Sequence, residues 1–304
     1  MKVFKSIGEI NEAACTLPAI RLAIAAAADE EVLKAVKMAE KDGIIEPVLI
    51  GNEKKITQAL REVDYHTRGR VIGVESPEEA ADKSMELIKE GQADLAMKGL
   101  LSTRTILKAF LAEEYGFRQG SLLSLVTLLY LDKEKRNIII SDSGINIAPG
   151  LEEKMEIIKN AVEIAGLIGI KNPKVAVLSA VEKVNPAMKS TVEAALLAKM
   201  SERGQFKKAI VEGPLALDNA LSAEAAERKG IDGSVAGQAD ILITPDIEAG
   251  NILYKALVYY NQLPSASLVS GARIPLVLTS RADSARTKYN SIALARIVLK
   301  KLAP

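Results

Sequence analysis

Short apolar runs alternate with longer amphipathic segments along most of the chain. Several runs are continuously apolar and lack the period-two alternation of a strand with one face in water. Such runs are typical of parallel strands that helices cover on both faces. They predict strands at residues 21–27, 46–51, 70–74, 93–99, 137–142, 174–180, 208–213, 240–245 and 274–280.

The intervening segments show helical patterns. Residues 151–169 repeat apolar side chains at helical spacing, and two glutamates occupy the first turn, where the helix dipole favours acid. Residues 77–91 begin with proline and end with glycine. Residues 121–142 differ, because they predict two strands that meet at a charged turn. This alternation indicates an α/β fold with mostly parallel sheets.

Composition narrows the possible functions. The 304 residues suggest two domains or one large one, and the net charge of +1 provides no broad field for nucleic acid or an anionic membrane. Cys15 is the only cysteine, so an intrachain disulfide is excluded, which fits a reducing cytoplasm. His66 is the only histidine, in a polar context, which disfavours a zinc site and a Ser-His-Asp triad.

Polar side chains gather where the predicted strands end, and ligands of open α/β sheets bind outside those carboxyl ends. Taken singly, Ser102, Ser141 and Asp218 are expected to cap helices. Together the loops offer cations, hydroxyls and helix N-termini, which suit an anionic ligand that carries phosphate. The cations are Lys98, Arg104, Lys108 and Arg281. The sequence has no phosphate-loop or dinucleotide glycine fingerprint, which disfavours the enzymes that depend on one.

Six blocks of sequence follow in order at 97–111, 141–154, 181–195, 212–222, 236–260 and 278–285. They include "MKGLLSTRTILKAFL", "SDSGINIAPGLEEK" and "LTSRADSA", and together they resemble the phosphate acetyl/butyryl transferases, most closely the butyryl branch. The resemblance implies two α/β domains similar to those of isocitrate and isopropylmalate dehydrogenases, with the active site in the interdomain cleft. The first domain is expected at 1–136 plus a C-terminal helix at about 286–304, and the second at 137–285.

The implied reaction is the reversible transfer of a short acyl group between coenzyme A and orthophosphate, which gives acyl phosphate. Butyryl is the first choice of acyl group and acetyl the second, which would place the enzyme in butanoate metabolism in the cytoplasm. The resemblance further implies a homo-oligomer built from dimers. Acyl-CoA, orthophosphate and acyl phosphate are the expected partners, with no tightly bound cofactor, no metal, no nucleic acid and no membrane.

The resemblance also suggests site residues. The family's Ser-Arg pair matches Ser280 and Arg281, to which we assign the oxyanion or thiol and the phosphate. The acidic base of the acetyl branch falls here on Thr287, so Asp283 is our hypothesis for the base and Asp246 its rival. The residues expected to bind phosphate or coenzyme A are Lys98, Thr103, Lys108, Asp142, Ser143, Asn146 and Asn251.

Alternatives stay open at this point. One is an NAD- and metal-dependent decarboxylating dehydrogenase of the same fold, which would need clustered aspartates such as Asp142, Asp218 and Asp246. Another is a non-catalytic regulator that binds coenzyme A or acyl phosphate. At the level of single residues, Ser280 could cap the last helix and Lys108 could be a solvated helix lysine.

Overall fold

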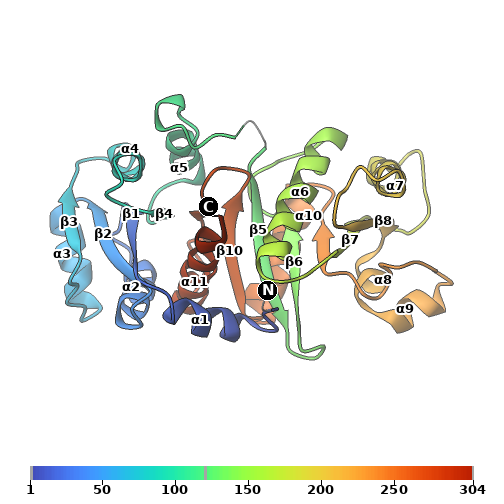
Figure 1. The fold of residues 1–304 in the computed structure, drawn as a ribbon, viewed down its shortest axis with the longest axis horizontal. Helices are drawn as coiled ribbons and strands as arrows, with labels where there is room; N and C mark the ends of the chain where they lie inside the picture. The colour runs from blue at the N-terminus through green and yellow to red at the C-terminus, as the bar shows by residue number, and fades with distance from the viewer. Residues whose placement is uncertain (1–2, 120–121, 303–304) are drawn as a thin grey trace. The chain divides into compact units, whose positions relative to one another are not determined.

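The computed structural model describes residues 3–119 and 122–302 and confirms an α/β fold with mostly parallel strands (Figure 1). The chain divides into two compact units. One consists of Ile7–Ser121 and Ser265–Pro304, and is called here the discontinuous unit. The other consists of Met1–Ser6 and Leu122–Pro264, and is called the central unit.

The discontinuous unit has strand order β3-β2-β1-β4-β11-β10, in which every neighbouring pair is parallel except β10 and β11. Its strands are β1 (Ile20–Ala25), β2 (Ile45–Gly51), β3 (Arg70–Gly73), β4 (Leu95–Lys98), β10 (Ser265–Ser270) and β11 (Leu276–Val277). Its helices are α1 (Ile7–Cys15), α2 (Glu30–Lys41), α3 (Glu53–Glu62), α4 (Pro77–Lys89), α5 (Thr103–Phe110), η1 (Glu113–Tyr115) and α11 (Ala285–Leu302). Helix α11 packs against β10, α1 and α2.

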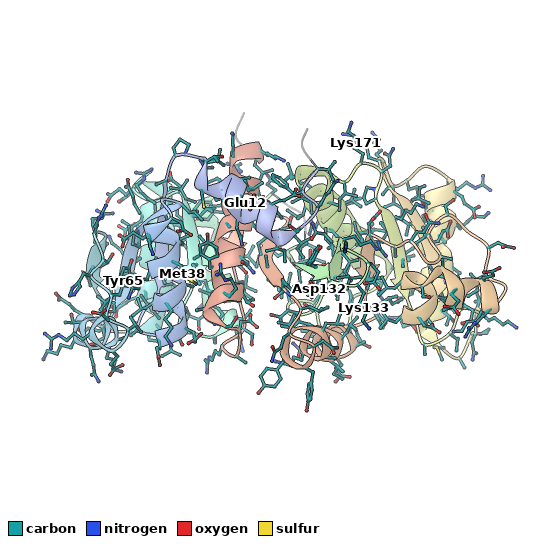
Figure 2. All side chains as sticks on the ribbon, turned by 90° about the horizontal axis from the view of Figure 1, so that it is seen from below. Glu12, Met38, Tyr65, Asp132, Lys133 and Lys171 are labelled. Atoms are coloured by element: carbon teal, nitrogen blue, oxygen red, sulfur yellow. The ribbon has the colours of Figure 1, made fainter. Side chains whose placement is uncertain are left out.

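The central unit has strand order β5-β6-β9-β7-β8, in which only the β5–β6 pair is antiparallel. Its strands are β5 (Ser124–Leu131), β6 (Arg136–Ser141), β7 (Lys174–Leu178), β8 (Ile210–Leu215) and β9 (Ile241–Ile243). Its helices are α6 (Leu151–Leu167), α7 (Lys189–Glu202), α8 (Leu217–Leu221), α9 (Ala223–Arg228), α10 (Ile247–Lys255) and the π-helical turn η2 (Ala256–Tyr260). The predicted charged turn joins β5 to β6, with Asp132 and Lys133 at its tip (Figure 2).

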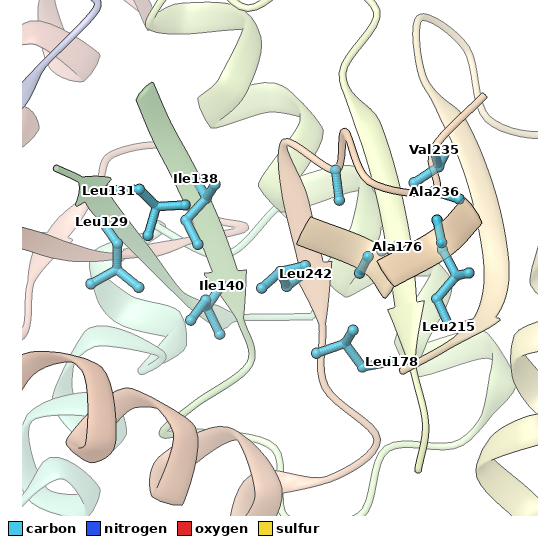
Figure 3. Packing of buried hydrophobic residues seen from close by; sticks show 13 residues of the cluster. Leu129, Leu131, Ile138, Ile140, Ala176, Leu178, Leu215, Val235, Ala236 and Leu242 are labelled. Carbon is cyan, nitrogen blue, oxygen red and sulfur yellow. The ribbon is translucent and has the colours of Figure 1, made fainter. Parts of the chain in front are cut away.

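Strand side chains of the central unit pack into one apolar cluster (Figure 3). Leu129 and Leu131 of β5 contribute to the same cluster as Ile138 and Ile140 of β6, because alternate residues of a strand point to one face. Leu242 of β9 extends the cluster across the sheet. Burial of these alternate side chains on one face sets the register in which the strands pair.

Two helix predictions are confirmed with their start signals. Ser76 caps α4 by accepting a hydrogen bond from the Glu79 backbone, and Pro77 occupies the first helical position. At α6, the carboxylate of Glu153 accepts from the backbone N–H of Gly150 at 2.7 Å. Among the residues that the structure describes, none of the helices is both long and apolar enough to span a bilayer.

The boundaries between the two units differ from the predicted domain boundaries. The prediction placed residues 1–136 and 286–304 in the first domain and residues 137–285 in the second. Residues 122–136 belong with the central unit because β5 pairs with β6. Residues 265–285 belong with the discontinuous unit because β11 pairs with β4 and β10. The predicted limits at residues 1 and 304, and the start of the hairpin at residue 121, lie outside the described residues.

Candidate active site

In the discontinuous unit, three neighbouring strands end side by side. Lys98, the last residue of β4, is in register with Ala25 of β1, and Met97 is in register with Val277 of β11. The loops that follow β4 and β11 therefore begin at the same edge of the sheet. Gly99 allows the close approach of the first loop, because a Cβ there would lie 2.3 Å from the Ala26 carbonyl oxygen.

Lys98 is buried at this edge, with 5% of its surface exposed. Its Nζ donates to the carbonyl oxygens of Gly99 and Leu101, each at 3.3 Å. Burial lowers the pKa of Lys98, and the nearby positive charges of Arg281 and Lys288 lower it further. An ammonium has three donors, and two of those of Lys98 are accounted for by these carbonyl oxygens in the described part of the chain.

The Ser280–Asp283 turn follows β11 and is held from two sides. The carboxylate of Asp283 accepts from the Ser280 backbone N–H at 2.7 Å. Lys288, on α11, donates from Nζ to the carbonyl oxygen of Ser280 at 3.1 Å and to that of Asp283 at 2.5 Å. The backbone of the turn is therefore fixed, while Arg281 is exposed and Ser280 is partly exposed.

Ser280 could either cap helix α11 or belong to the candidate site, and the hydrogen bonds at the start of α11 exclude the cap. The cap of α11 is Ser284, whose Oγ accepts from the Thr287 backbone N–H at 3.2 Å. Ser280 lies before that cap, and its Oγ accepts from the Ala282 backbone N–H at 3.4 Å, so the hydroxyl belongs to the turn and does not cap the helix. Thr287 is buried, with its hydroxyl 3.5 Å from that of Ser265.

The remaining candidate binding residues of the discontinuous unit lie on helix α5. The expected cap at Ser102 is confirmed, since its Oγ accepts from the Thr105 backbone at 3.0 Å. Thr103 is the first helical residue and is partly exposed. Lys108 is exposed in the last turn of α5. It takes no part in the hydrogen bonds that Lys98 makes to Gly99 and Leu101.

In the central unit, the loop after β6 is organised around Asp142. This carboxylate is 2% exposed and accepts from the backbones of Gly144, Ile145 and Asn146 at 2.8, 3.1 and 3.2 Å. It also accepts from Nδ2 of Asn146 at 2.6 Å. Burial raises the pKa of Asp142, and these N–H groups offset part of that effect. Asp142 therefore shapes the loop from inside.

Replacing Asp142 by asparagine is expected to destabilise the protein by about 2 kcal/mol. Asparagine has one acceptor oxygen and would turn its NH2 group toward N–H donors that the carboxylate now satisfies. The shift of the urea unfolding midpoint at pH 7 measures the effect. Asp132→Asn, at the exposed turn between β5 and β6, is the matched control and is expected to change nothing. Equal midpoints for both variants would contradict this role.

The loop after β9 lies against the loop after β6. Thr244 donates from Oγ1 to the carbonyl oxygen of Asp142 at 2.9 Å, and Asn251 donates from Nδ2 to that of Ser143 at 3.2 Å. Asp246 caps α10 by accepting from the Ala249 backbone at 2.8 Å. The hydroxyl of Ser143 is buried without a hydrogen-bond partner in the described part of the chain. Thus the structure brings together Asp142, Ser143, Asn146 and Asn251.

Two other expected caps are wrong. Ser141 is the buried last residue of β6, and its hydroxyl donates to the Leu125 carbonyl oxygen at 3.0 Å. Asp218 lies inside α8 and pairs with Lys229 at 2.9 Å. A polar residue after an apolar run can end a strand or sit within the next helix, and the pattern alone does not distinguish these positions.

A model of the family described as Phosphate acetyl/butaryl transferase matches residues 75–296. The chain belongs to this family. It is 47% identical to the phosphate acetyltransferase of Thermotoga maritima over 91% of this chain and 94% of that protein. It is 44% identical to the phosphate butyryltransferase of Clostridium acetobutylicum over 97% of this chain and 99% of that protein.

A solved structure supports the same family assignment. The crystal structure of a branched-chain phosphotransacylase from Enterococcus faecalis superposes with a TM-score of 0.79 at 32% identity, covering 92% of this chain and 99% of that one. The resemblance found in the motif blocks is confirmed, and the chain is a phosphate acyltransferase. Its relatives are named for both acetyl and butyryl transfer, so family membership leaves the acyl group open.

Sequence patterns missed one buried residue of this phosphate acyltransferase. Lys288 is 2% exposed, and burial lowers its pKa although Asp283, Asp29 and Glu31 act in the opposite direction. Its position within a helix gave no sign of burial, because lysine usually occupies an exposed face. Within residues 3–119 and 122–302, no three side chains of histidine, cysteine, aspartate or glutamate gather as metal ligands. The absence of a metal requirement stays a prediction.

Proposed function

We propose that this phosphate acyltransferase transfers a butyryl group between coenzyme A and orthophosphate. In the forward direction, a phosphate oxygen attacks the thioester carbonyl, the C–S bond breaks, and butyryl phosphate and the coenzyme A thiolate leave. The thiolate takes up a proton to give free thiol. The observation that carries the proposal is the fixed Ser280–Arg281 turn beside buried Lys98 at adjacent strand ends.

The side chains take distinct roles in this proposal. Arg281 binds the phosphate through its planar fork, and the remaining N–H of Lys98 supplies a second contact. Ser280 donates to the oxyanion that forms on the carbonyl carbon, and such donors contribute roughly 3 kcal/mol each. Because both loops start from sheet strands, the donors are positioned before the substrate binds.

The hydrogen bonds of Asp283 and Asp246 distinguish the two candidates for the base. The carboxylate of Asp283 accepts from the Ser280 backbone and belongs to a turn that Lys288 holds, so protonation would disturb the turn. Asp246 accepts one hydrogen bond through Oδ1 and lies at the wall of an open cavity. We therefore prefer Asp246 as the group that exchanges a proton with the thiol, and assign Asp283 to positioning Ser280.

The butyryl preference is supported by the near-complete coverage of the Clostridium acetobutylicum butyryltransferase and by the branched-chain phosphotransacylase fold match. We further propose that the enzyme acts in butanoate metabolism in the cytoplasm, without a tightly bound cofactor, as a homo-oligomer built from dimers. Its partners are acyl-CoA, orthophosphate and acyl phosphate.

Release of free thiol from butyryl-CoA, followed with a thiol reagent, tests the proposal. We expect release that depends on phosphate and needs neither NAD nor added metal. The value of kcat/KM for butyryl-CoA should exceed that for acetyl-CoA about tenfold, since two methylenes are worth about 1.6 kcal/mol. No release from acetyl-, propionyl-, butyryl- or branched acyl-CoA would disprove the proposed function. Equal rates with acetyl-CoA would disprove the butyryl preference alone.

A further inference from the structure

The central unit contains a second cavity at the edge of its sheet opposite to the loops of Asp142 and Asp246. This cavity has a volume of about 990 Å³ and is lined by the C-terminal half of α6 and by the loops that lead into β7 and β8. The two loops meet where the Ile210 backbone N–H donates to the carbonyl oxygen of Pro173 at 3.1 Å. Cavities of this size hold small-molecule ligands in proteins.

The helix that borders this cavity contains a glycine that packing does not require. Val162 and Leu167 of α6, together with the buried ring of Phe206, give the cavity apolar walls. Gly166 belongs to the same helix, although glycine is the least favourable residue inside a helix apart from proline. A Cβ at Gly166 would meet no atom within 4 Å. Glycine at this position therefore leaves open space in the cavity.

Lysines border the cavity on the side of the two loops. Lys171 comes from the loop before β7, and Lys207 and Lys208 come from the loop before β8. All three are exposed, and none of them forms an ion pair within the part of the chain that the structure describes. Lys159 differs, because it pairs with Glu156 at 2.6 Å. Three ammonium groups without a counter-charge at one rim attract a ligand that carries several negative charges, such as a phosphate chain.

One carboxylate lines the cavity from α6. Glu163 lies three positions before Gly166, so the two residues share a face of the helix. Burial raises the pKa of Glu163, and no cation or hydrogen-bond donor among the described residues acts in the opposite direction. The lysines therefore lie away from this carboxylate, and the cavity has one negative site and a separate positive rim. The two oxygens of Glu163 can accept from N–H groups of a ligand.

We propose that this cavity binds a guanine nucleotide. One edge of guanine carries two neighbouring donors, the N1–H and the N2 amino group, which match the two oxygens of Glu163. The apolar wall contacts the flat base, and the rim of Lys171, Lys207 and Lys208 binds the phosphates. Adenine presents an acceptor nitrogen at the corresponding edge, so the carboxylate disfavours it. The inference does not depend on the proposed function, because the cavity lies at the amino ends of β7 and β8, away from the candidate catalytic loops.

Isothermal titration of the full chain with GDP tests this assignment. We expect saturable binding at least about tenfold tighter than that of ADP, and unchanged in the presence of saturating coenzyme A. Coenzyme A carries an adenine nucleotide, so it reports whether GDP has entered the substrate site instead. The absence of binding at millimolar GDP, equal affinity for GDP and ADP, or displacement of GDP by coenzyme A would each overturn the proposal.

Glu163→Gln tests the recognition of the base. A hydrogen bond to a charged group is stronger than one to a neutral group, so Kd for GDP should rise about tenfold or more while Kd for ADP stays within twofold. Glu152→Gln is the matched control, because Glu152 is exposed in the first turn of the same helix and does not line the cavity. An unchanged ratio of the two Kd values in Glu163→Gln would contradict the role of the carboxylate.

Gly166→Leu tests the cavity without a risk to the helix, since leucine is a better helix former than glycine. The side chain would occupy the open space, and we expect GDP binding to be lost while the urea midpoint stays the same or rises. Thiol release from butyryl-CoA in the absence of GDP should be unchanged, because Gly166 lies outside the candidate catalytic loops. A Gly166→Leu protein that binds GDP as the unchanged protein does would show that the nucleotide binds elsewhere.

Discussion

Replacement of Arg281 by alanine is expected to lower kcat/KM for phosphate by roughly 10²- to 10³-fold. In the proposed function, the guanidinium holds and orients the attacking phosphate through charge-assisted contacts, and the loss of such a positioned contact is expected to cost about this much. For Arg281→Lys, kcat/KM for phosphate should lie between the values for the unchanged protein and for Arg281→Ala. Lysine keeps the positive charge but loses the planar guanidinium that can donate two parallel hydrogen bonds. Initial rates over a range of phosphate concentrations at saturating butyryl-CoA measure the effect.

Arg286→Ala is the matched control for this experiment. Arg286 is exposed five positions further along, and its guanidinium lies over the Tyr289 ring, 5.3 Å from the ring centroid. Its removal should leave the apparent KM for phosphate unchanged. If Arg281→Ala behaved like Arg286→Ala, Arg281 would have no part in phosphate binding, and the assignment of the turn would fail with it.

Replacement of Lys288 by methionine is expected to affect both stability and activity. The carbonyl oxygen of Asp283 would lose its Nζ donor, whereas that of Ser280 keeps a hydrogen bond from the Asp283 backbone N–H at 3.2 Å. An unsatisfied buried acceptor costs about 1–3 kcal/mol, so unfolding should become easier by about 2 kcal/mol. With its turn released, Ser280 would lose its position, and kcat should drop at least about tenfold.

Urea unfolding and steady-state kinetics measure these two effects separately. Lys300→Met, on the exposed end of the same helix, is the control and should change stability by less than about 0.5 kcal/mol. Lys288→Arg keeps the charge and the donors, and should recover part of kcat. A Lys288→Met protein with unchanged kcat would show that the turn holds its conformation without this lysine.

The amino-acid pattern predicts most strands because their apolar runs are buried on both faces. The exception is β10, whose sequence Ser265–Ser270 contains three serines and yet is wholly buried. Small side chains are needed there because α11 packs against β10, and the hydroxyl of Ser291 accepts from the Ser267 backbone at 2.9 Å. Burial of small polar residues depends on this distant helix, which local periodicity does not reveal.

The same limit applies to the candidate site. The rule that ligands bind at strand ends led to the loops after β4 and β11 in one unit and after β6 and β9 in the other, because parallel register places the loops of a unit at one edge of its own sheet. It did not distinguish a carboxylate that organises a loop from one that faces a ligand. Asp142 and Asp283 organise their own loops, and only coordinates show their N–H partners. Lys288 lies outside all these loops and needs the tertiary fold to be found.

The discontinuous unit has a consequence for synthesis on the ribosome. Its strands β1 to β4 emerge early, but β10, β11 and α11 follow the whole central unit. Until they arrive, β4 lacks its neighbour β11, and the apolar faces that α11 covers stay open. The nascent chain therefore presents an unpaired strand edge for the time needed to translate residues 122–264, a period in which chaperones can bind it. The turn to which we assign phosphate binding follows the central unit in the chain, so this protein gains its proposed activity only after residues 122–264 have been translated.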